Sequence, residues 1–306
     1  MLAKVFSAGL IGIDAYLIEI EVDVSRGLPT EVVVGLPDQA VRESKDRVRS
    51  ALFNSGYSYP EDKVTVNLAP ADVKKEGPSF DLPIAIGMLA ADGKMGRKDF
   101  GPYLILGELA LTGAVRPVKG MLSIALLARR LGGKSLLVPA DNAPEAAIVS
   151  GVEVRAVKSL SEAVKFLEGG MELKPVAVDL KEIFEDSSCY AADFSDVKGQ
   201  ECVKRALEVA VAGGHNLLMI GPPGAGKSML AKRIPTILPK MSLEEALETT
   251  RIHSSAGLLK RGKALIAVRP FHSPHHTVSD IALIGGGTKI RAGEVSLAHN
   301  GVLFLD

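Results

Sequence analysis

The chain has 306 residues, with 36 lysines and arginines against 36 aspartates and glutamates, so its formal net charge at pH 7 is zero. This balance gives no global bias toward nucleic acid or toward an anionic membrane surface. The two cysteines, Cys189 and Cys202, are too few for a disulfide framework and fit a reducing compartment. No signal-peptide pattern follows Met1 and no apolar run reaches membrane-spanning length, so we expect a soluble cytoplasmic protein without a membrane partner.

Short apolar runs alternate with helical patterns over the first 170 residues, which predicts an α/β domain spanning 1–170. Four of these runs are expected to be short buried strands: 32–34, 64–68, 104–106 and 136–138. Asp38 can cap a helix whose apolar positions Val41, Val48 and Leu52 fall on one face. Further helices are expected over 82–89 and 124–131.

Periodicity weakens after Gly170. The segment 171–190, with Pro175 and mixed charge, is expected to be a linker. A second domain is expected over 191–306. Its first long helix, predicted over 201–212, leads into an apolar run at 216–220 that is typical of a buried parallel strand.

A phosphate-binding loop of the pattern G-x-x-x-x-G-K-S follows that run. Its residues are Gly221, Pro222, Pro223, Gly224, Ala225, Gly226, Lys227 and Ser228. The glycines permit positive φ, so that successive backbone N–H groups can turn toward phosphate oxygens. We expect Lys227 to contact the β- and γ-phosphates, Ser228 to bind Mg²⁺, and a helix over 229–234 to point its positive end at the anion.

The last residues of the sequence form an acidic strand end. Four apolar residues, 302–305, precede Asp306, which is the pattern of a Walker B strand. An acidic residue beside a phosphate loop can hold the Mg²⁺ that bridges the β- and γ-phosphates. We therefore expect ATP and Mg²⁺ as cofactors, with Ser228 and Asp306 as the metal ligands.

Four stretches of the second half resemble known ATPases. The segment 193–200 resembles the part of AAA+ ATPases that lies near the adenine. Closer resemblances, to the magnesium-chelatase-like AAA+ ATPases of the YifB/ComM type, lie at 213–218, 269–277 and 293–306. Together with matches in the first half, the resemblance covers essentially the whole chain. It implies a partial P-loop AAA+ domain over 191–306, cut off at its Walker B strand.

The same resemblance implies a hexameric homo-oligomer that acts as a DNA helicase in branch migration, during DNA uptake and recombination. DNA is then the expected partner. An insertion between the two nucleotide motifs is typical of the family, and 284–288 is expected to be the tip of its hairpin, with Lys289 and Arg291 contacting DNA. The alternative is a chelatase-like protein-remodelling ATPase that does not act on DNA. The shared motifs cannot distinguish this alternative from a DNA helicase.

The resemblance also implies a glutamate directly after Asp306 that would polarise the attacking water, followed by sensor residues, an arginine finger and a helical lid. The sequence ends before these parts. Hydrolysis depends on positioning water and on neutralising developing charge. We therefore expect this chain to bind ATP without substantial turnover, as the N-terminal portion of an active ATPase, and we assign no catalytic residue within it.

The first domain resembles the Lon protease domain and ribosomal protein S5 domain 2. Within it, the residues that match the YifB/ComM family lie at 35–41, 66–72 and 75–83. The turn that ends at Ser79 is similar to the nucleophile turn of Lon-type Ser–Lys proteases, but a serine nucleophile needs an amine within reach. Leu122 occupies the position of the Lon lysine. The domain is therefore expected to be non-proteolytic.

Two further interpretations concern single side chains. Ser79 is expected to cap the helix that follows it, and the neighbouring Lys74 and Lys75 are expected to be solvated. Three histidines form an H-x-x-H-H pattern at positions 272, 275 and 276. They could share a zinc ion, but no further ligand pair completes a known spacing, so a structural or subunit-contact role is favoured.

Overall fold

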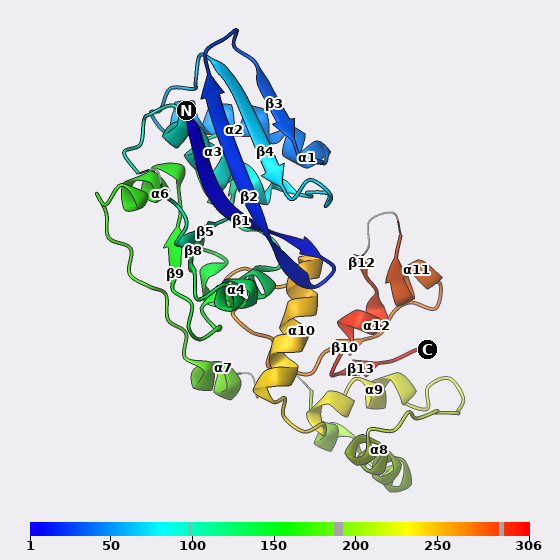
Figure 1. The fold of residues 1–306 in the computed structure, drawn as a ribbon. Coiled ribbons are helices and arrows are strands. Elements are labelled where there is room, and N and C mark those ends of the chain that lie inside the picture. Colours follow the sequence, from blue (N-terminus) through cyan, green and yellow to red (C-terminus); the bar gives the residue numbers. More distant parts are fainter. Residues whose placement is uncertain (98, 187–191, 288–290) are drawn as a thin grey trace. The chain divides into compact units, whose positions relative to one another are not determined.

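The computed structural model describes residues 1–97, 99–186, 192–287 and 291–306 (Figure 1). It falls into two compact units. The first comprises Met1–Val178 with Gly257–Ala264, and the second comprises Asp179–Ala256 with Leu265–Asp306. Parallel strand pairs occur in both units, which confirms the mixed α/β class.

A four-stranded sheet opens the first unit, with the strand order β1-β2-β4-β3. A long antiparallel hairpin, β1 (Leu2–Ile11) and β2 (Asp14–Ser25), pairs through β2 with β4 (Lys63–Ala69), and β3 (Glu31–Val34) adds a parallel edge (blue and cyan in Figure 1). Sequence analysis missed the hairpin, although Ile18, Ile20 and Val22 alternate with half-buried residues along β2, as expected of a sheet with one buried face.

The run 32–34 forms a strand as predicted, but its expected burial is wrong. Val32 is 44% exposed and Val34 is 42% exposed. Because β3 is an edge strand and successive side chains point to opposite faces, these two valines lie on the outer face of the sheet.

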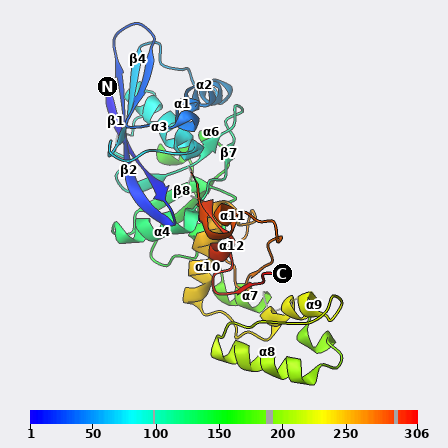
Figure 2. The ribbon, with the colours of Figure 1, turned by 90° about the vertical axis from the view of Figure 1, so that its right-hand side faces the viewer.

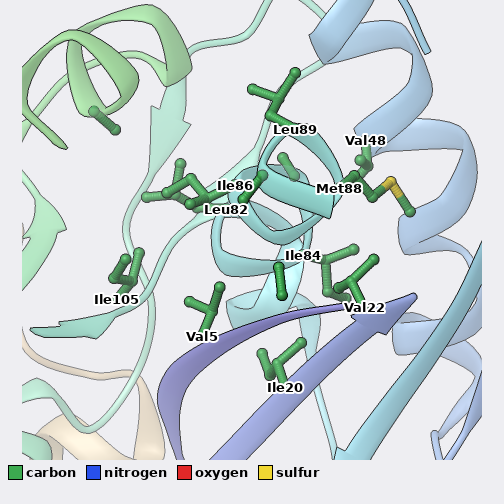
Figure 3. Packing of buried hydrophobic residues seen from close by; sticks show 14 of the residues in the cluster. Val5, Ile20, Val22, Val48, Leu82, Ile84, Ile86, Met88, Leu89 and Ile105 are labelled. Atoms are coloured by element: carbon green, nitrogen blue, oxygen red, sulfur yellow. The ribbon is translucent and has the colours of Figure 1, made fainter. Parts of the chain in front are cut away.

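The core of the first unit surrounds α3 (Asp81–Ala91), every residue of which is buried. The helix packs on β1, β2 and α2 (Ser44–Asn54). Figure 3 shows side chains of α3, among them Ile84, lying over Val5, Ile20 and Val22 of the hairpin. Burying each side chain of this size stabilises the fold by about 2 kcal/mol.

Helix boundaries in this unit follow the expected local signals. Asp38 caps α1 (Gln39–Arg42) by accepting the N–H of Val41, and α2 continues after Glu43. Helix α3 ends where Gly93 adopts a φ of 75°, a conformation that suits glycine. The helix predicted over 82–89 is thus confirmed, whereas the single helix predicted after Asp38 forms as two helices, α1 and α2, divided at Glu43.

A second, fully parallel sheet of order β5-β8-β9 completes the first unit. Its strands are β5 (Tyr103–Ile105), β8 (Ser135–Pro139) and β9 (Val154–Val157), so the predicted strands at 104–106 and 136–138 are present. The remaining elements are a 3₁₀ turn, η1 (Pro78–Phe80), the pair β6 (Glu108–Leu109) and β7 (Val115–Arg116), and the helices α4 (Met121–Arg130), α5 (Ala143–Ala146) and α6 (Leu160–Leu167).

The second unit is mainly helical (Figure 2). Its helices are α7 (Leu180–Asp186), η2 (Phe194–Asp196), α8 (Glu201–Gly213), α9 (Lys227–Ala231), η3 (Ile234–Thr236), α10 (Leu243–Ala256), α11 (Asp280–Ile284) and α12 (Glu294–Leu297). Its strands are β10 (Phe271–His272) paired in parallel with β13 (Val302–Leu303), and β11 (Gly285–Gly286) paired antiparallel with β12 (Arg291–Ala292).

The segment expected as a linker contains the helix α7, while residues 187–190 lie outside the described part. One expectation about this part of the chain needs correction. The run 216–220 is not a buried strand, because no strand pairs with it within the described residues, and Leu218 and Ile220 are 83% and 90% exposed. A parallel strand is buried only where neighbouring strands pair with its edges and helices cover its faces.

In the described part of the chain, no helix combines the length and the apolar composition needed to cross a membrane.

Candidate functional site

The phosphate loop connects the exposed segment 216–220 to α9. Gly224 and Gly226 adopt φ values of 83° and 88°, which residues with a side chain rarely take. A Cβ atom at Gly224 would meet no atom within 4 Å, so this glycine is required by its backbone conformation rather than by lack of space. The helix begins at Lys227, two residues earlier than predicted, and ends at Ala231 rather than near 234.

The side chain of Lys227 lies back along the loop. Its Nζ donates to the carbonyl oxygens of Gly221, at 2.8 Å, and of Pro222, at 3.2 Å. The ammonium group is therefore held inside the curve of the loop by two neutral acceptors. An anion bound in this curve would offer it a stronger, charge-assisted partner.

Ser228 and Asp306, the two predicted metal ligands, lie side by side. The Oγ of Ser228 donates to Oδ2 of Asp306 at 2.9 Å. Strand β13 brings Asp306 to this place, and the N–H of Phe304 extends the pairing by donating to the carbonyl of His272 at 2.8 Å. A hydroxyl and a carboxylate oxygen at hydrogen-bond distance form a donor set that suits a hard cation such as Mg²⁺.

The segment 193–200 is anchored to the residues that follow α9. Asp193 and Asp196 form a capping box around η2. Arg233 donates from Nε to the carbonyl of Asp193 at 3.1 Å, and Oγ1 of Thr236 accepts the N–H of Phe194 at 3.1 Å. Hydrogen bonds from Ser195 hold the pKa of Asp193 below its usual value. The segment is thereby fixed relative to the phosphate loop.

Sequence reasoning singled out neither Arg233 nor the role of Gln200, the last residue of this segment. Nε2 of Gln200 donates to the carbonyl of Ala225, in the middle of the phosphate loop, at 3.2 Å. No local pattern predicts a contact between residues 25 positions apart.

Two of the three histidines of the H-x-x-H-H pattern have separate hydrogen-bond partners. Nδ1 of His272 lies 2.6 Å from Oε2 of Glu294, and Nδ1 of His275 lies 2.8 Å from Oγ1 of Thr277. The rings of His275 and His276 are 4.1 Å apart at their centroids. Among the described residues, no group of three or more His, Cys, Asp or Glu side chains could hold a metal ion. The structural or subunit-contact role favoured for these histidines stays a prediction.

A hairpin lies near the expected insert, formed by β11 and β12, which pair through Gly285–Ala292 and Gly286–Arg291. The expected tip at 284–288 is wrong for its first residues, because Ile284 ends α11 and Gly285–Gly286 form strand β11. Arg291 is exposed on β12. Residues 288–290, with Lys289 among them, lie outside the described residues.

In the first unit, the serine of the Lon-like turn does not cap a helix, contrary to expectation. Ser79 lies inside η1, and α3 begins after Phe80 without a side-chain cap. The carbonyl of Ser79 instead accepts the N–H of Gly107. Leu122 is fully buried in α4, where its N–H donates to Oε1 of Glu145 at 2.8 Å.

Lys75 is not solvated, which corrects a second expectation about this region. Its side chain is fully buried, and Nζ donates to the carbonyls of Pro70 and of Val73, the latter at 2.7 Å. Burial lowers the pKa of Lys75. Lys74 is exposed and pairs with Glu76, as expected of a surface lysine.

Two family models and several known proteins match this chain. Residues 193–306 match the family model "Magnesium chelatase, subunit ChlI", and residues 20–142 match "Subunit ChlI of Mg-chelatase". The uncharacterized protein YifB of Escherichia coli is 47% identical over 306 residues, and the competence protein ComM of Haemophilus influenzae is 44% identical over 310 residues. Both matches cover 100% of the chain, and 59% and 60% of the respective relatives.

A weaker similarity extends to Lon proteases. Lon protease 2 of Bacillus subtilis is 25% identical over 185 residues, which is 54% of this chain and 33% of that protein.

The α/β units, the phosphate loop and the two family matches define a magnesium-chelatase-like protein, a class that fits the AAA+ ATPases. Within it, the chain belongs to the YifB/ComM-type family. The chain spans about 60% of the length of these relatives.

Proposed function

We propose that the second unit binds ATP together with Mg²⁺. The observation that carries this proposal is the 2.9 Å contact between Ser228 Oγ and Asp306 Oδ2, directly beside Lys227. The two predicted metal ligands come from motifs 78 positions apart and meet at one point. A surface turn that carried the glycine pattern by chance would not be expected to bring Ser228 and Asp306 together.

Each group has a distinct role in this proposal. The backbone N–H groups around Gly224 and Gly226 would bind phosphate oxygens, and Lys227 would exchange its two carbonyl acceptors for the β- and γ-phosphates. Ser228 and Asp306 would hold Mg²⁺, which neutralises phosphate charge when bound.

For the complete protein we propose a hexameric, cytoplasmic AAA+ motor that acts as a DNA helicase in branch migration during DNA uptake and recombination. The support is the family membership, one relative of which is named a competence protein. The glycine-rich hairpin β11–β12 with the exposed Arg291 supplies a candidate DNA contact. The alternative is a chelatase-like protein-remodelling ATPase without DNA, favoured by the descriptions of the two family models.

Binding of a fluorescent ATP analogue to the 306-residue chain, with Mg²⁺ present, tests the first proposal. We expect Lys227→Ala to weaken binding by at least about tenfold, because a charge-assisted contact is lost. Lys232→Ala removes an equal charge from an exposed position five residues later and serves as the matched control. Equal affinity of the wild type and Lys227→Ala would contradict ATP binding at this loop.

A strand-displacement assay on the full-length protein separates the two motor hypotheses. A DNA helicase loses strand displacement with Lys227→Ala, and it loses DNA affinity and part of its salt dependence when Lys289 and Arg291 are both replaced by alanine. If DNA affinity and its salt dependence do not change, the hairpin is not the DNA contact. If no strand displacement occurs with the wild type, the protein-remodelling alternative is favoured.

A further inference from the structure

Gln200 has a backbone conformation that is unusual for a residue with a side chain. Its φ of 56° and ψ of 39° lie in the left-handed region, and it follows Gly199, whose φ is 68°. It occupies the N-cap position of α8, yet its side chain makes no capping hydrogen bond to that helix. Short polar side chains such as those of Ser, Thr, Asp and Asn are the usual caps, and the longer side chain of Gln200 makes its contact outside the helix.

The side chain of Gln200 reaches the phosphate loop. Its Nε2 donates to the carbonyl of Ala225 at 3.2 Å, and the same nitrogen lies 3.7 Å from the place where a Cβ of Gly226 would be. Both ends of the segment before α8 are secured, because Arg233 holds Asp193 while α8 continues directly after Gln200. The side-chain amide of Gln200 is therefore held in place beside the carbonyl of Ala225.

The acceptor, the carbonyl of Ala225, lies between two glycines of the loop. Ala225 lies between Gly224 and Gly226, both at positive φ, and the peptide planes beside glycines rotate with little steric resistance. The N–H of Ala225 is already held by the carbonyl of Pro222 at 3.2 Å. The contact with Gln200 restrains the next peptide plane, which joins Ala225 to Gly226.

A trans peptide group is planar, and its C=O and N–H point in opposite directions. When Gln200 holds the carbonyl of Ala225, the N–H of Gly226 faces the other way. We propose that Gln200 is a positioning residue, which orients the Ala225–Gly226 peptide so that the Gly226 N–H is presented to a phosphate oxygen of the bound nucleoside triphosphate. This inference rests on the proposed ATP binding at the loop.

Two substitutions in the 306-residue chain separate positioning from simple structural support. Gln200→Gly removes the donor and suits the left-handed backbone, so the melting temperature without nucleotide should not fall. Gln200→Glu keeps the size but replaces the donor with an acceptor that repels the Ala225 carbonyl. We expect both variants to bind the fluorescent ATP analogue about fivefold more weakly than the wild type, the usual size of one lost hydrogen bond.

A second readout follows the Gly226 amide directly. In the ¹⁵N-labelled wild type, addition of Mg²⁺–ATP should shift the Gly226 N–H resonance downfield, as a hydrogen bond to phosphate would do. In Gln200→Gly at saturating nucleotide, that shift should be reduced. Glu208→Gln, on the exposed side of α8, is the control and should leave affinity and resonance unchanged.

The outcomes distinguish this inference from the proposal on which it rests. If the wild type and Lys227→Ala bind equally, ATP binding at the loop is wrong. If the wild type binds more tightly than Lys227→Ala, while both Gln200 variants bind like the wild type, only the positioning role is overturned. If the Gln200 variants lose melting temperature but keep affinity, the residue supports the fold and does not position the loop.

Discussion

Arg47 of α2 donates two hydrogen bonds to the carboxylate of Asp81, the first residue of α3. Its Nε donates to Oδ2 at 2.7 Å and its Nη2 donates to Oδ1 at 3.0 Å. The Asp81 side chain is fully buried and also accepts the N–H of Leu109 at 3.2 Å, while Arg47 donates to the carbonyl of Ala40 at 2.9 Å. The side chain of Arg47 thus connects α2 with α1, through Ala40, and with the start of α3, through Asp81.

Asp81 makes stability depend on pH. Burial raises the pKa of Asp81 to about 6, against the opposing effect of Arg47. A pKa above the unfolded value of about 4 means that the folded protein binds this proton more tightly, so the stabilisation is complete below pH 4 and is lost as the pH rises to 6. Relative to Asp81→Asn, the free energy of unfolding of the wild type should fall by about 3 kcal/mol over this interval.

Urea unfolding of the wild type and Asp81→Asn at pH 4, 5, 6 and 7 measures this difference. The asparagine has nearly the same shape and does not titrate, so all other ionisable groups cancel. If the difference in free energy of unfolding between the wild type and Asp81→Asn stays constant from pH 4 to pH 7, Asp81 keeps an ordinary pKa.

Replacing only Arg47 should lower the free energy of unfolding more than replacing both Arg47 and Asp81. Arg47→Met leaves a buried carboxylate without its charged partner and should lower the free energy of unfolding at pH 7 by about 3 kcal/mol. The double variant Arg47→Met with Asp81→Leu replaces both charges by apolar groups and should recover most of that loss. Chemical denaturation of the wild type, Arg47→Met, Asp81→Leu and the double variant gives the coupling free energy, and additive effects would argue against the pair.

Lys75 and Lys74 are neighbours with opposite surroundings, which makes them a matched test. Lys75→Ala leaves the carbonyls of Pro70 and Val73 without their donor inside the fold and opens a cavity. It should lower the free energy of unfolding by about 2 kcal/mol. Lys74→Ala, at an exposed site, should change it by less than about 0.5 kcal/mol. Equal effects in denaturant titrations would contradict the burial of Lys75.

Magnesium dependence tests the pairing of Ser228 with Asp306. For the wild type, removing Mg²⁺ with a chelator should weaken binding of the ATP analogue by about tenfold, or about 1.4 kcal/mol. Asp306→Asn removes a charged ligand and should make affinity nearly independent of Mg²⁺. Asp280→Asn, which neutralises an exposed carboxylate of the same unit, should keep the wild-type dependence. A full magnesium effect in Asp306→Asn would rule out this residue as a ligand.

Local sequence signals predicted several helices and strands of the first unit correctly. The cap at Asp38 and the apolar periodicity of 82–89 depend only on neighbours a few positions away, and both elements formed. The run 216–220 is as apolar as a buried strand, yet it lies exposed, because burial requires partner strands that periodicity does not specify. The hairpin β1–β2 was missed although its alternation is present in the sequence.

Burial of single polar residues also escaped prediction. In the sequence, the pair Lys74–Lys75 has the composition of an exposed basic surface. Only the tertiary structure shows that the ammonium group of Lys75 is buried and hydrogen-bonded to backbone carbonyls of residues 70–75. Ser79 resembles a helix cap, but η1 intervenes before α3 begins.

The sequence by itself predicted the phosphate-binding loop and determined the family, because eight consecutive residues and a few long motifs contain that information without reference to the rest of the fold. Only the tertiary structure decided which groups act together there. Asp306 lies against Ser228, and Gln200 holds Ala225, across 78 and 25 positions of chain. Such contacts depend on where strand β13 and the segment before α8 are anchored, and no local pattern specifies that.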